Sequence, residues 1–428
     1  MQNRDSQHAL VRTEEASIDP RRSAPQRPVP SPEALPASPW LSRKGIILKV
    51  VIVALLPILM GVSAGAPRTP GYRFTVEAGA QAHTVTAWMG GGILGKVEDG
   101  IAGSEAAPDD ELEYFGLVDR LLQLRRSGGD TSGIEARLVR LRPSVERAIE
   151  ARVSRALEKA GFSADLGGLR FVLPPVLFRF ESPPALLVVS PRDRIEEMAT
   201  VLLRPDTTLQ EAEGLEDRIA RQGYSALVTT IGGLGVYPSM VPESSDIRWT
   251  LRTVAHEWAH QFFALRPLGW RYALGAERDD RMVAVNETAA DIIGKEIGDA
   301  LYQEYSAETR GALPPSAPED LQFRTRMREI RMEVDRLLAQ GKVDEAERYM
   351  EDARRHLEAE GYRIRKLNQA YFAFYGSYSD QISLGGAKGD DVGARLRRLR
   401  EISATLGDFG WVVSSVGSYG DLLRLTSP

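Results

Sequence analysis

The chain has 428 residues, 43% of them hydrophobic and 26% charged, and its 54 basic and 59 acidic residues give a formal net charge of −5 at pH 7. This is typical of a globular protein with room for a large core and several domains, and the lack of a basic excess argues against nucleic acid as a partner. The chain contains no cysteine, which excludes disulfide bonds, thiol catalysis and cysteine-ligated zinc, so a metal ion would have to be held by His, Asp or Glu.

The amino-terminal segment, residues 1 to 44, is rich in Pro, Ser, Arg and Glu and has no periodic hydrophobic pattern. Such a composition predicts a disordered tail. An apolar segment follows from Gly45 to Ala66, and Lys49 is its only charged residue. Because about 20 residues suffice to span a bilayer, we predict one amino-terminal transmembrane helix here.

The charges around this segment predict its orientation. Arg43 and Lys44 precede it, and the next basic residue is Arg68, so the positive-inside rule places the tail in the cytoplasm and the rest of the chain outside. The alternative is a cleaved signal peptide, because residues 62 to 64 end in small side chains. The long preceding region favours the anchor. We expect a single-pass cell-membrane protein, or a secreted one after cleavage, with an extracytoplasmic bulk.

Residues 67 to 109 are predicted to form a linker with short strands, since YRFTVEA and HTVTAWM are rich in β-branched and aromatic residues. The run MGGGILG lacks the following Lys-Ser/Thr of a phosphate-binding loop and indicates a linker or turn. Two helices are expected between residues 110 and 161, ELEYFGLVDRLLQLRR and PSVERAIEARVSRALEKAG. Pro143 would stand in the first turn of the second helix and Gly161 at its end.

Short β-branched and aromatic runs up to residue 245 predict a small mixed β-sheet. The runs are LRFVLPPVLFRF, ALLVVSP, MATVLLRP and YSALVTTIGGLGVYP, with the helix TLQEAEGLEDRIARQG before the last. Residues 110 to 245 would then form an amino-terminal subdomain of helices and sheet, and residues 246 to 428 a helical subdomain. The predicted fold class is therefore α+β, a small mixed sheet followed by a mainly helical half.

A long antiparallel helical hairpin is predicted as an insertion over residues 320 to 366, because apolar residues recur at a heptad-like step on two arms with Gly341 between them. Its charged remainder is most simply a solvated face. The apolar positions are Met327, Ile330, Val334 and Leu337 on the first arm and Val343, Ala346, Met350, Ala353 and Leu357 on the second.

The sequence SSDIRWTLRTVAHEWAHQFFALRP is expected to form one helix with Ser245 or Asp246 as its cap. Within HEWAH, His256 and His260 stand four residues apart, which places them one turn apart on one face. Two imidazoles in this arrangement can bind one zinc ion at about 2.0–2.1 Å. Glu257 can reach a water molecule on that ion without binding the metal, and so serve as general base. The simpler alternative is a buried helix with two hydrogen-bonded histidines.

A catalytic zinc site has three protein ligands and one open position. The run VNETAADIIG, on a helix expected from about Met282 to Tyr302, offers Glu287 as the third ligand. Asp291, one turn later, can accept the second N–H of a ligating histidine. Small residues, Ala289, Ala290 and Gly294, would let this helix approach the HEWAH helix closely. Read alone, the run is an amphipathic helix with acidic surface residues.

HEWAH followed by NETAAD resembles the gluzincin metallopeptidases, the thermolysin-like group whose pattern is HExxH and NExxxD. The resemblance covers residues 256 to 291 and so bears on the chemistry more than on the overall fold. It implies one zinc ion per chain held by His256, His260 and Glu287. It also implies Glu257 as general base and Asp291 as the partner of a ligating histidine.

A second resemblance lies in KLNQAYFAFYGSYSD, which is similar to a Leu-Asn-Asn-Ala…Tyr block in a family of bacterial zinc aminopeptidases that also has a helical insertion before it. Gln369 stands here in place of the second Asn, and Ser377 precedes the final Tyr.

The spacing of this block has a physical interpretation of its own. Asn368, Tyr371, Tyr375 and Tyr378 recur at helical steps and would share one face. Tyr378 or Tyr375 is then a candidate donor to the oxyanion of a peptide-bond transition state, with Asn368 as a substrate contact. An aromatic stripe in a helical core is the alternative.

The run TTIGGLGVYP resembles the edge strand that lies beside the zinc ion in gluzincins. An extended peptide could pair with such a strand, and Gly232, Gly233 and Gly235 would allow its backbone to approach closely. The glycines could equally mark a bend.

Together these patterns predict a membrane-anchored zinc metallopeptidase acting on a peptide or protein substrate, as an aminopeptidase or an endopeptidase. An aminopeptidase needs an acidic group for the substrate's free amine, and Glu243 or the pair Asp279 and Asp280 are candidates that nothing singles out. The competing interpretations are a membrane-tethered helical scaffold with a structural or vestigial metal site, and a zinc hydrolase of non-peptide amides. No oligomeric state follows from the sequence.

Overall fold

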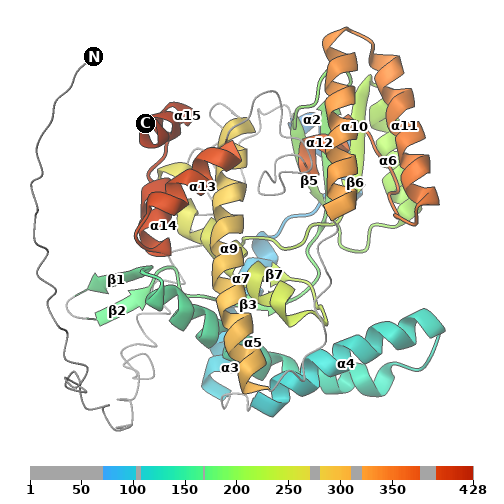
Figure 1. Cartoon of the computed structure of the whole chain (residues 1–428). Helices are drawn as coiled ribbons and strands as arrows, with labels where there is room; N and C mark the ends of the chain where they lie inside the picture. Colours follow the sequence, from blue (N-terminus) through green and yellow to red (C-terminus); the bar gives the residue numbers. More distant parts are fainter. Residues whose placement is uncertain are drawn as a thin grey trace, which may run out of the picture. The chain divides into compact units, whose positions relative to one another are not determined.

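The computed structural model describes residues 71–102, 108–166, 169–269, 280–309, 321–375 and 392–427. All of them belong to the second of the two units into which the chain divides, Leu48–Pro428 (Figure 1). The predicted tail and transmembrane segment, residues 1–66, lie outside the described ranges. Within those ranges, no helix combines the length and the apolarity that a bilayer crossing requires.

The first described segment is helical, so the prediction of short strands between residues 67 and 109 is wrong there. It forms α2 (Gly71–Ala78), the 3-10 helix η3 (Gly79–Gln81) and α3 (Thr86–Ala102). In α2, Phe74 and Ala78 are buried, whereas Val76, which a strand would place on the same face, is exposed. Helical spacing therefore places Phe74 and Ala78 on the same buried face, and this packing overrides the β-propensity of the run.

The glycine run of MGGGILG lies inside α3, and close packing explains two of its members. A Cβ atom at Gly92 would lie 3.2 Å from Cδ of Pro238, and one at Gly95 would overlap the guanidinium group of Arg179. The tertiary contacts that glycine allows at these positions offset its poor helix propensity. The predicted linker or turn is accordingly replaced by a packed helix.

The two helices predicted between residues 110 and 161 are present as α4 (Pro108–Ser127) and α5 (Ser132–Lys159), which pack against each other. Because α5 begins at Ser132, Pro143 lies inside it and not in its first turn as predicted. Pro143 removes one backbone hydrogen bond of the helix. The helix continues because the side chains of Leu141 and Val145, which flank Pro143, are buried in the core. Gly161 adopts a φ of +100° just beyond its end.

The strands form three small sheets, which confirms the small mixed sheet of the predicted α+β class but divides it. One is an antiparallel pair, a second is a parallel pair, and the third has β4 in the centre of three antiparallel strands. The helix α6 (Leu209–Ala220) packs on β6 of the third sheet. The pairs are β1 (Ser163–Leu166) with β2 (Leu169–Val172) and β3 (Phe178–Phe180) with β7 (Ser239–Val241), and the triplet is β5 (Ala199–Leu203), β4 (Ala185–Pro191) and β6 (Tyr224–Thr229).

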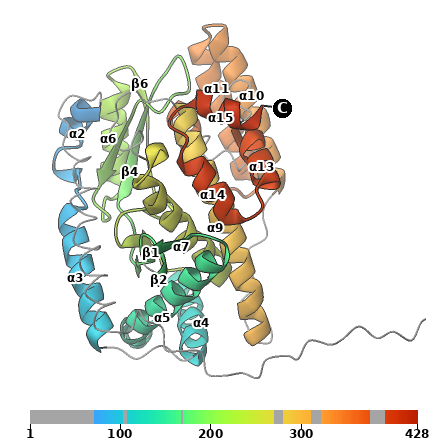
Figure 2. The ribbon, with the colours of Figure 1, turned by 90° about the vertical axis from the view of Figure 1, so that its left-hand side faces the viewer.

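The remainder of the described chain is helical, as predicted. The helices α13, α14 and α15 form a group at the carboxyl end, and α13 and α14 pack against α9 (Figure 2). The bounds are α7 (Ile247–Ala264), α9 (Asp280–Glu308), α10 (Leu321–Ala339), α11 (Val343–Ala359), α12 (Gln369–Tyr375), α13 (Val392–Ile402), α14 (Leu406–Ser414) and α15 (Tyr419–Thr426).

The helices α7 and α9 contact each other at backbone distance. A Cβ atom at Gly294 would lie 2.8 Å from the carbonyl oxygen of Arg252, and one at Gly298 would lie 2.6 Å from Arg252 Cα. Ala289 and Ala290 are fully buried, as expected for small residues at such an interface. The close approach fixes the position of each helix on the other.

The predicted hairpin is present as α10 and α11, side by side in Figure 1. Met327 and Val334 on one arm and Ala346 and Met350 on the other are fully buried. Gly341 turns the chain between the arms with a φ of +73°. The hairpin core continues into α12, since Phe372 belongs to the same cluster of buried side chains.

A buried carboxylate joins α6, β6 and the segment before α12. The side chain of Glu216 is only 2% exposed, accepts the N–H of Val228 at 2.6 Å and pairs with Arg365 and, at 3.0 Å, with Lys366. Burial would raise the pKa of Glu216, but Arg365, Lys366 and the Val228 N–H outweigh it and hold the pKa below its usual 4.5. The interaction therefore stabilises the fold above that pH and is lost as the pH falls through the lower, folded-state pKa.

We predict that Glu216→Gln lowers the free energy of unfolding by about 2 kcal/mol near neutral pH, because two cations lose their shared carboxylate. The difference between parent and variant should shrink below about pH 4.5, where the unfolded-state carboxyl group is protonated. Urea unfolding of parent and variant, near neutral pH and below about pH 4.5, measures this difference in the free energy of unfolding.

Glu351→Gln is the matched control. Glu351 also pairs with two arginines, Arg354 and Arg355, but its side chain is 44% exposed. Its loss should cost less than about 0.5 kcal/mol. A cost for Glu216→Gln that is equally small, or that does not change with pH, would contradict the role given to Glu216.

Candidate metal centre

The helix that carries HEWAH is fixed at its start and along its buried face. Asp246 is its cap, and the Asp246 side chain accepts the N–H of Trp249 at 3.0 Å. Trp258 is buried, stacks on Phe262 and donates its Nε1–H to the carbonyl of Pro174 at 2.8 Å. These contacts hold α7 in one rotation about its axis, with its histidines directed at α9.

Three side chains from α7 and α9 converge and could hold a metal ion: His256, His260 and Glu287. The two Nε2 atoms are 3.0 Å apart, and Glu287 Oε2 lies 3.7 Å from that of His256 and 3.5 Å from that of His260. A tetrahedral zinc site with bonds of about 2.0–2.1 Å has ligand atoms separated by about 3.3 Å. The triangle of donor atoms therefore matches one face of such a tetrahedron.

Each imidazole is oriented by a partner on α9. His256 Nδ1 lies 2.8 Å from Asp291 Oδ1, and His260 Nδ1 lies 2.7 Å from Asn286 Oδ1. Because a carboxylate and an amide oxygen accept hydrogen bonds, both Nδ1 atoms carry the proton and both Nε2 lone pairs face the centre of the triangle. The Asp291 contact is the one expected from the sequence. Asn286 was given no role, although it stands directly before Glu287 in NETAAD.

The charges at this position favour a cation. Glu287 is 8% exposed, and its Oε2 is buried without a hydrogen-bond partner, which is costly for an oxygen that no cation neutralises. Burial would raise the pKa of Glu287, but the two imidazoles hold it well below its ordinary range. Burial would lower the pKa of His256, but the nearby carboxylates of Asp291 and Glu287 outweigh burial and raise this pKa. The surroundings of both groups therefore favour positive charge at this position. Two nitrogens and one carboxylate suit a divalent metal ion.

Glu257 lies beside this group under a loop that contains GGLG. Glu257 is 5% exposed, and burial raises the pKa of its carboxyl group. A Cβ atom at Gly233 would overlap that carboxylate, and one at Gly235 would lie 2.9 Å from His260 Cβ and 3.2 Å from Glu257 Oε2. Glycine is therefore required for the loop to approach the site this closely.

The loop is not the strand that was predicted. Strand β6 ends at Thr229, and the glycines follow it outside any strand; Leu234 alone forms a bridge, with Met240 of β7. Gly232 is exposed, and a Cβ atom there would meet only Trp249, at 3.9 Å. Thus two of the three predicted glycines contact site residues and the third does not.

The outer edge of β6 is already covered. The carbonyl of Ala226 accepts from Asn368 Nδ2 at 2.9 Å, the carbonyl of Val228 accepts from Arg365 at 2.9 Å, and the Val228 N–H is held by Glu216. Asn368 also accepts the N–H of Tyr371 at 2.9 Å at the start of α12. These contacts tie the Asn368 side chain to β6 and to the start of α12, and its role as a substrate contact stays a prediction.

The predicted tyrosines lie on different sides of the boundary of the described residues. Tyr375 ends α12, its ring is tilted against that of Tyr371 at 4.5 Å, and its hydroxyl lies 2.9 Å from Thr229 Oγ1. Tyr378 lies outside the described ranges, like Asp279.

The carboxylate of Glu243 is engaged by Tyr114 at 2.6 Å and Arg142 at 2.8 Å, so it does not present a free acidic group for a substrate amine.

Comparisons with protein-family models, with curated proteins and with solved structures find no match to this chain. The assignment of a candidate metal centre accordingly depends on the convergence and orientation of the donor atoms of His256, His260 and Glu287.

We predict close to one zinc ion per full-length chain, measured by mass spectrometry of the purified protein after zinc is supplied and excess removed. His256→Ala and Glu287→Ala should retain little zinc, because each removes one of three ligands. Asn286→Ala should bind zinc about 10- to 100-fold more weakly, because only the orientation of His260 is lost.

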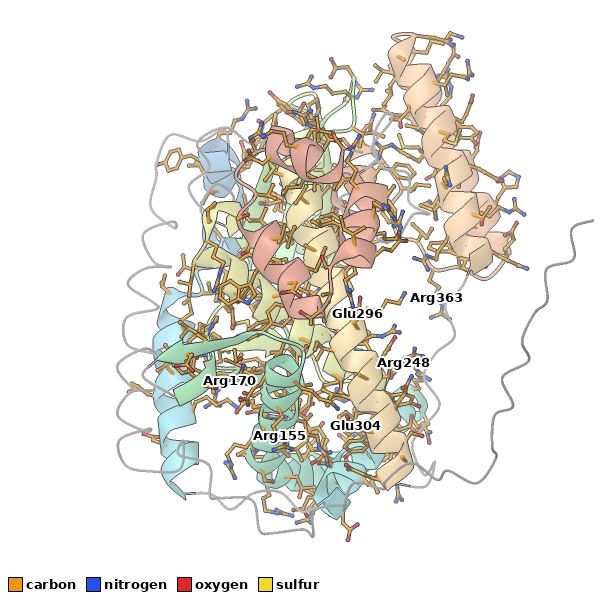
Figure 3. The ribbon with its side chains drawn as sticks, turned by 60° about the vertical axis from the view of Figure 1, so that its left-hand side comes forward. Arg155, Arg170, Arg248, Glu296, Glu304 and Arg363 are labelled. Atoms are coloured by element: carbon orange, nitrogen blue, oxygen red, sulfur yellow. The ribbon has the colours of Figure 1, made fainter. Side chains whose placement is uncertain are left out.

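Glu296→Ala is the control, since Glu296 also lies on α9 (Figure 3) but pairs with Arg400 at 2.8 Å. It should bind zinc as the parent does. A well-folded parent that takes up no zinc would contradict the metal centre.

Proposed function

We propose that this protein is a membrane-anchored zinc metallopeptidase that hydrolyses peptide bonds in a peptide or protein substrate. The observation that carries the proposal is the buried carboxylate of Glu257, which stands between two convergent histidines in sequence and is covered by a glycine loop. A purely structural metal site has no use for this fourth, non-ligating acidic group. In such a site, burying a further carboxylate would only cost stability.

The metal would be held by His256, His260 and Glu287. When bound, zinc supplies Lewis-acid chemistry, since it lowers the pKa of a water molecule towards about 7 and polarises a carbonyl group. Asp291 and Asn286 keep the protons of both histidines on Nδ1, so that each Nε2 stays available as a ligand.

Glu257 would move the proton in this reaction. Its carboxylate takes a proton from the attacking water and gives it to the nitrogen of the leaving amine, which makes it general base and then general acid. Burial raises its pKa, and a higher pKa makes the carboxylate a better proton acceptor. The loop around Gly233 and Gly235 covers this carboxylate and limits its contact with bulk water.

The side chains that cover β6 favour substrate binding beyond Thr229. Because Asn368, Arg365 and Glu216 occupy the outer edge of that strand, an extended peptide would pair with backbone groups of the loop that follows. Tyr375, hydrogen-bonded to Thr229 at 2.9 Å, and Tyr378 remain the candidates for donating to the oxyanion.

The location is part of the proposal. The apolar segment Gly45–Ala66 would anchor the chain, with the metal centre on the extracytoplasmic side, as the basic residues before it indicate. Helix α2 begins at Gly71, within a few residues of this segment, and exposes Tyr72 and Val76, which suits a surface close to lipid headgroups. A signal peptide that is cleaved would leave a secreted enzyme instead.

We predict that Glu257→Gln lowers kcat/KM on peptides by about 10²- to 10⁴-fold while zinc content and folding stay unchanged, because the amide cannot accept the proton. Digestion of a peptide library by the full-length protein first identifies a substrate and separates a peptidase from a hydrolase of other amides. Full activity of the variant would exclude this mechanism, and a parent with zinc but no activity on any peptide would favour the scaffold.

A matched pair of glycine variants tests the loop. Gly233→Ala should lower kcat by about 100-fold, because the new methyl group displaces the Glu257 carboxylate, a flexible end that moves more easily than the backbone. Gly232→Ala, whose methyl group meets only Trp249, should keep the activity of the parent. Equal effects of the two variants on kcat, with zinc content intact, would contradict the placement of the loop over Glu257.

A further inference from the structure

A buried cluster of three charges lies between α3 and α5 and has no part in the proposed chemistry. Lys96 of α3 is 8% exposed, and its Nζ lies 2.6 Å from Glu146 Oε2 and 2.8 Å from Glu150 Oε1. Both glutamates belong to α5 and are one turn apart. Burial would lower the pKa of Lys96, but Glu150 and Glu146 outweigh it, so the ammonium group stays charged.

The two carboxylates replace a neighbouring strand at the edge of β3. Glu150 Oε1 accepts the N–H of Phe178 at 3.0 Å, and Glu146 Oε1 accepts the N–H of Phe180 at 2.7 Å. In a strand, these N–H groups point to the same side, which is the side away from β7. The position of β3 is thereby tied to the position of the two carboxylates.

Strand β3 in turn holds β7 and, through it, the glycine loop. The two strands pair in parallel, with Phe178 opposite Ser239 and Phe180 opposite Val241. On its other edge, Met240 of β7 exchanges two backbone hydrogen bonds with Leu234, at 3.0 and 3.1 Å. Leu234 stands between Gly233 and Gly235, the two residues that approach Glu257. A continuous set of hydrogen bonds therefore runs from the charge cluster to the loop.

A second set of contacts joins α3 to the far end of the same loop. Met89 of α3 and Tyr237 are buried in one small cluster, and Gly92 lies against Pro238. Trp88 donates its Nε1–H to Glu181, the residue after β3, at 2.8 Å. Helix α3 thus contacts both β3 and the segment that leads from the loop into β7.

We propose that Lys96 is a positioning residue for the glycine loop over Glu257, an inference that rests on the proposed peptidase function. Two buried carboxylates one turn apart repel each other unless a cation lies between them. Lys96 lies within 2.6 and 2.8 Å of the two carboxylates and holds them where they accept the N–H groups of β3, which keeps β7, Leu234 and the flanking glycines in register with Glu257. The metal ligands on α7 and α9 lie outside this set of hydrogen bonds.

The test compares Lys96→Met with the parent in the full-length protein, by amide hydrogen exchange, zinc content and steady-state kinetics. We expect the amides of Leu234 and Met240 to exchange at least about tenfold faster, because the two carboxylates no longer hold β3 in place. Zinc content should stay at the parent level. With a peptide substrate, kcat should fall about tenfold with little change in KM, because Glu257 loses its aligned cover.

Two further variants separate positioning from a general loss of stability. The parent cluster has two carboxylates and one ammonium group, which give a formal net charge of −1. Adding Glu150→Gln to Lys96→Met leaves one carboxylate and so the same net charge. The amide oxygen of the new Gln side chain can still accept the N–H of Phe178. It should restore slow exchange at Leu234 and Met240. Leu138→Ala, which removes a fully buried side chain elsewhere on α5, should destabilise the fold without selectively accelerating these two amides.

Unchanged exchange at Leu234 and Met240 in Lys96→Met would overturn the inference, and so would the same selective acceleration in Leu138→Ala. Because hydrogen exchange needs no substrate, the failure of the two proposals can be told apart. If the parent cleaves no peptide, but Lys96→Met still accelerates exchange at Leu234 and Met240 relative to the parent, Lys96 remains the residue that positions the loop. Only the proposed peptidase function is then excluded.

Discussion

The backbone contact between α7 and α9 is the constraint on which the candidate site depends. One helix contributes both histidines and Glu257, and the other contributes Glu287, Asn286 and Asp291, so every donor and every orienting group lies on this pair. The contact is possible because Gly294 and Gly298 have no Cβ atom where the α7 backbone at Arg252 approaches α9. A displacement of one turn along either helix would separate Glu287 from the histidines.

Around this pair, buried carboxylates join elements that lie far apart in the sequence. Glu216 connects α6, β6 and the segment before α12, while Glu146 and Glu150 connect α5 with β3 and α3. In each case a carboxylate satisfies strand N–H groups that have no neighbouring strand, and a cation from a third element neutralises it. The small sheets are thus completed by side chains where a larger sheet would use further strands.

The sequence predicts those parts of the site that depend on local spacing. His256 and His260, and Glu287 and Asp291, are four residues apart, and a helix places such pairs on one face whatever the rest of the fold does. Contacts between distant parts of the chain do not follow from such local spacing. The engagement of Glu243 by Arg142, or of Asn368 by Ala226, joins residues more than 100 positions apart, which no local pattern encodes. Likewise the strands expected near residues 71–102 become helices because tertiary packing buries Phe74 and Ala78 together.

Both edges of the three-stranded sheet are covered by other parts of the chain. Side chains of Asn368 and Arg365 take the outer carbonyls of β6, and on the opposite edge His83 donates its N–H to Leu202 while Arg204 donates to Gln81. Open strand edges are the surfaces through which proteins pair with other chains and aggregate. The backbone groups of this sheet that are engaged in this way are therefore not available to pair with a strand of another molecule.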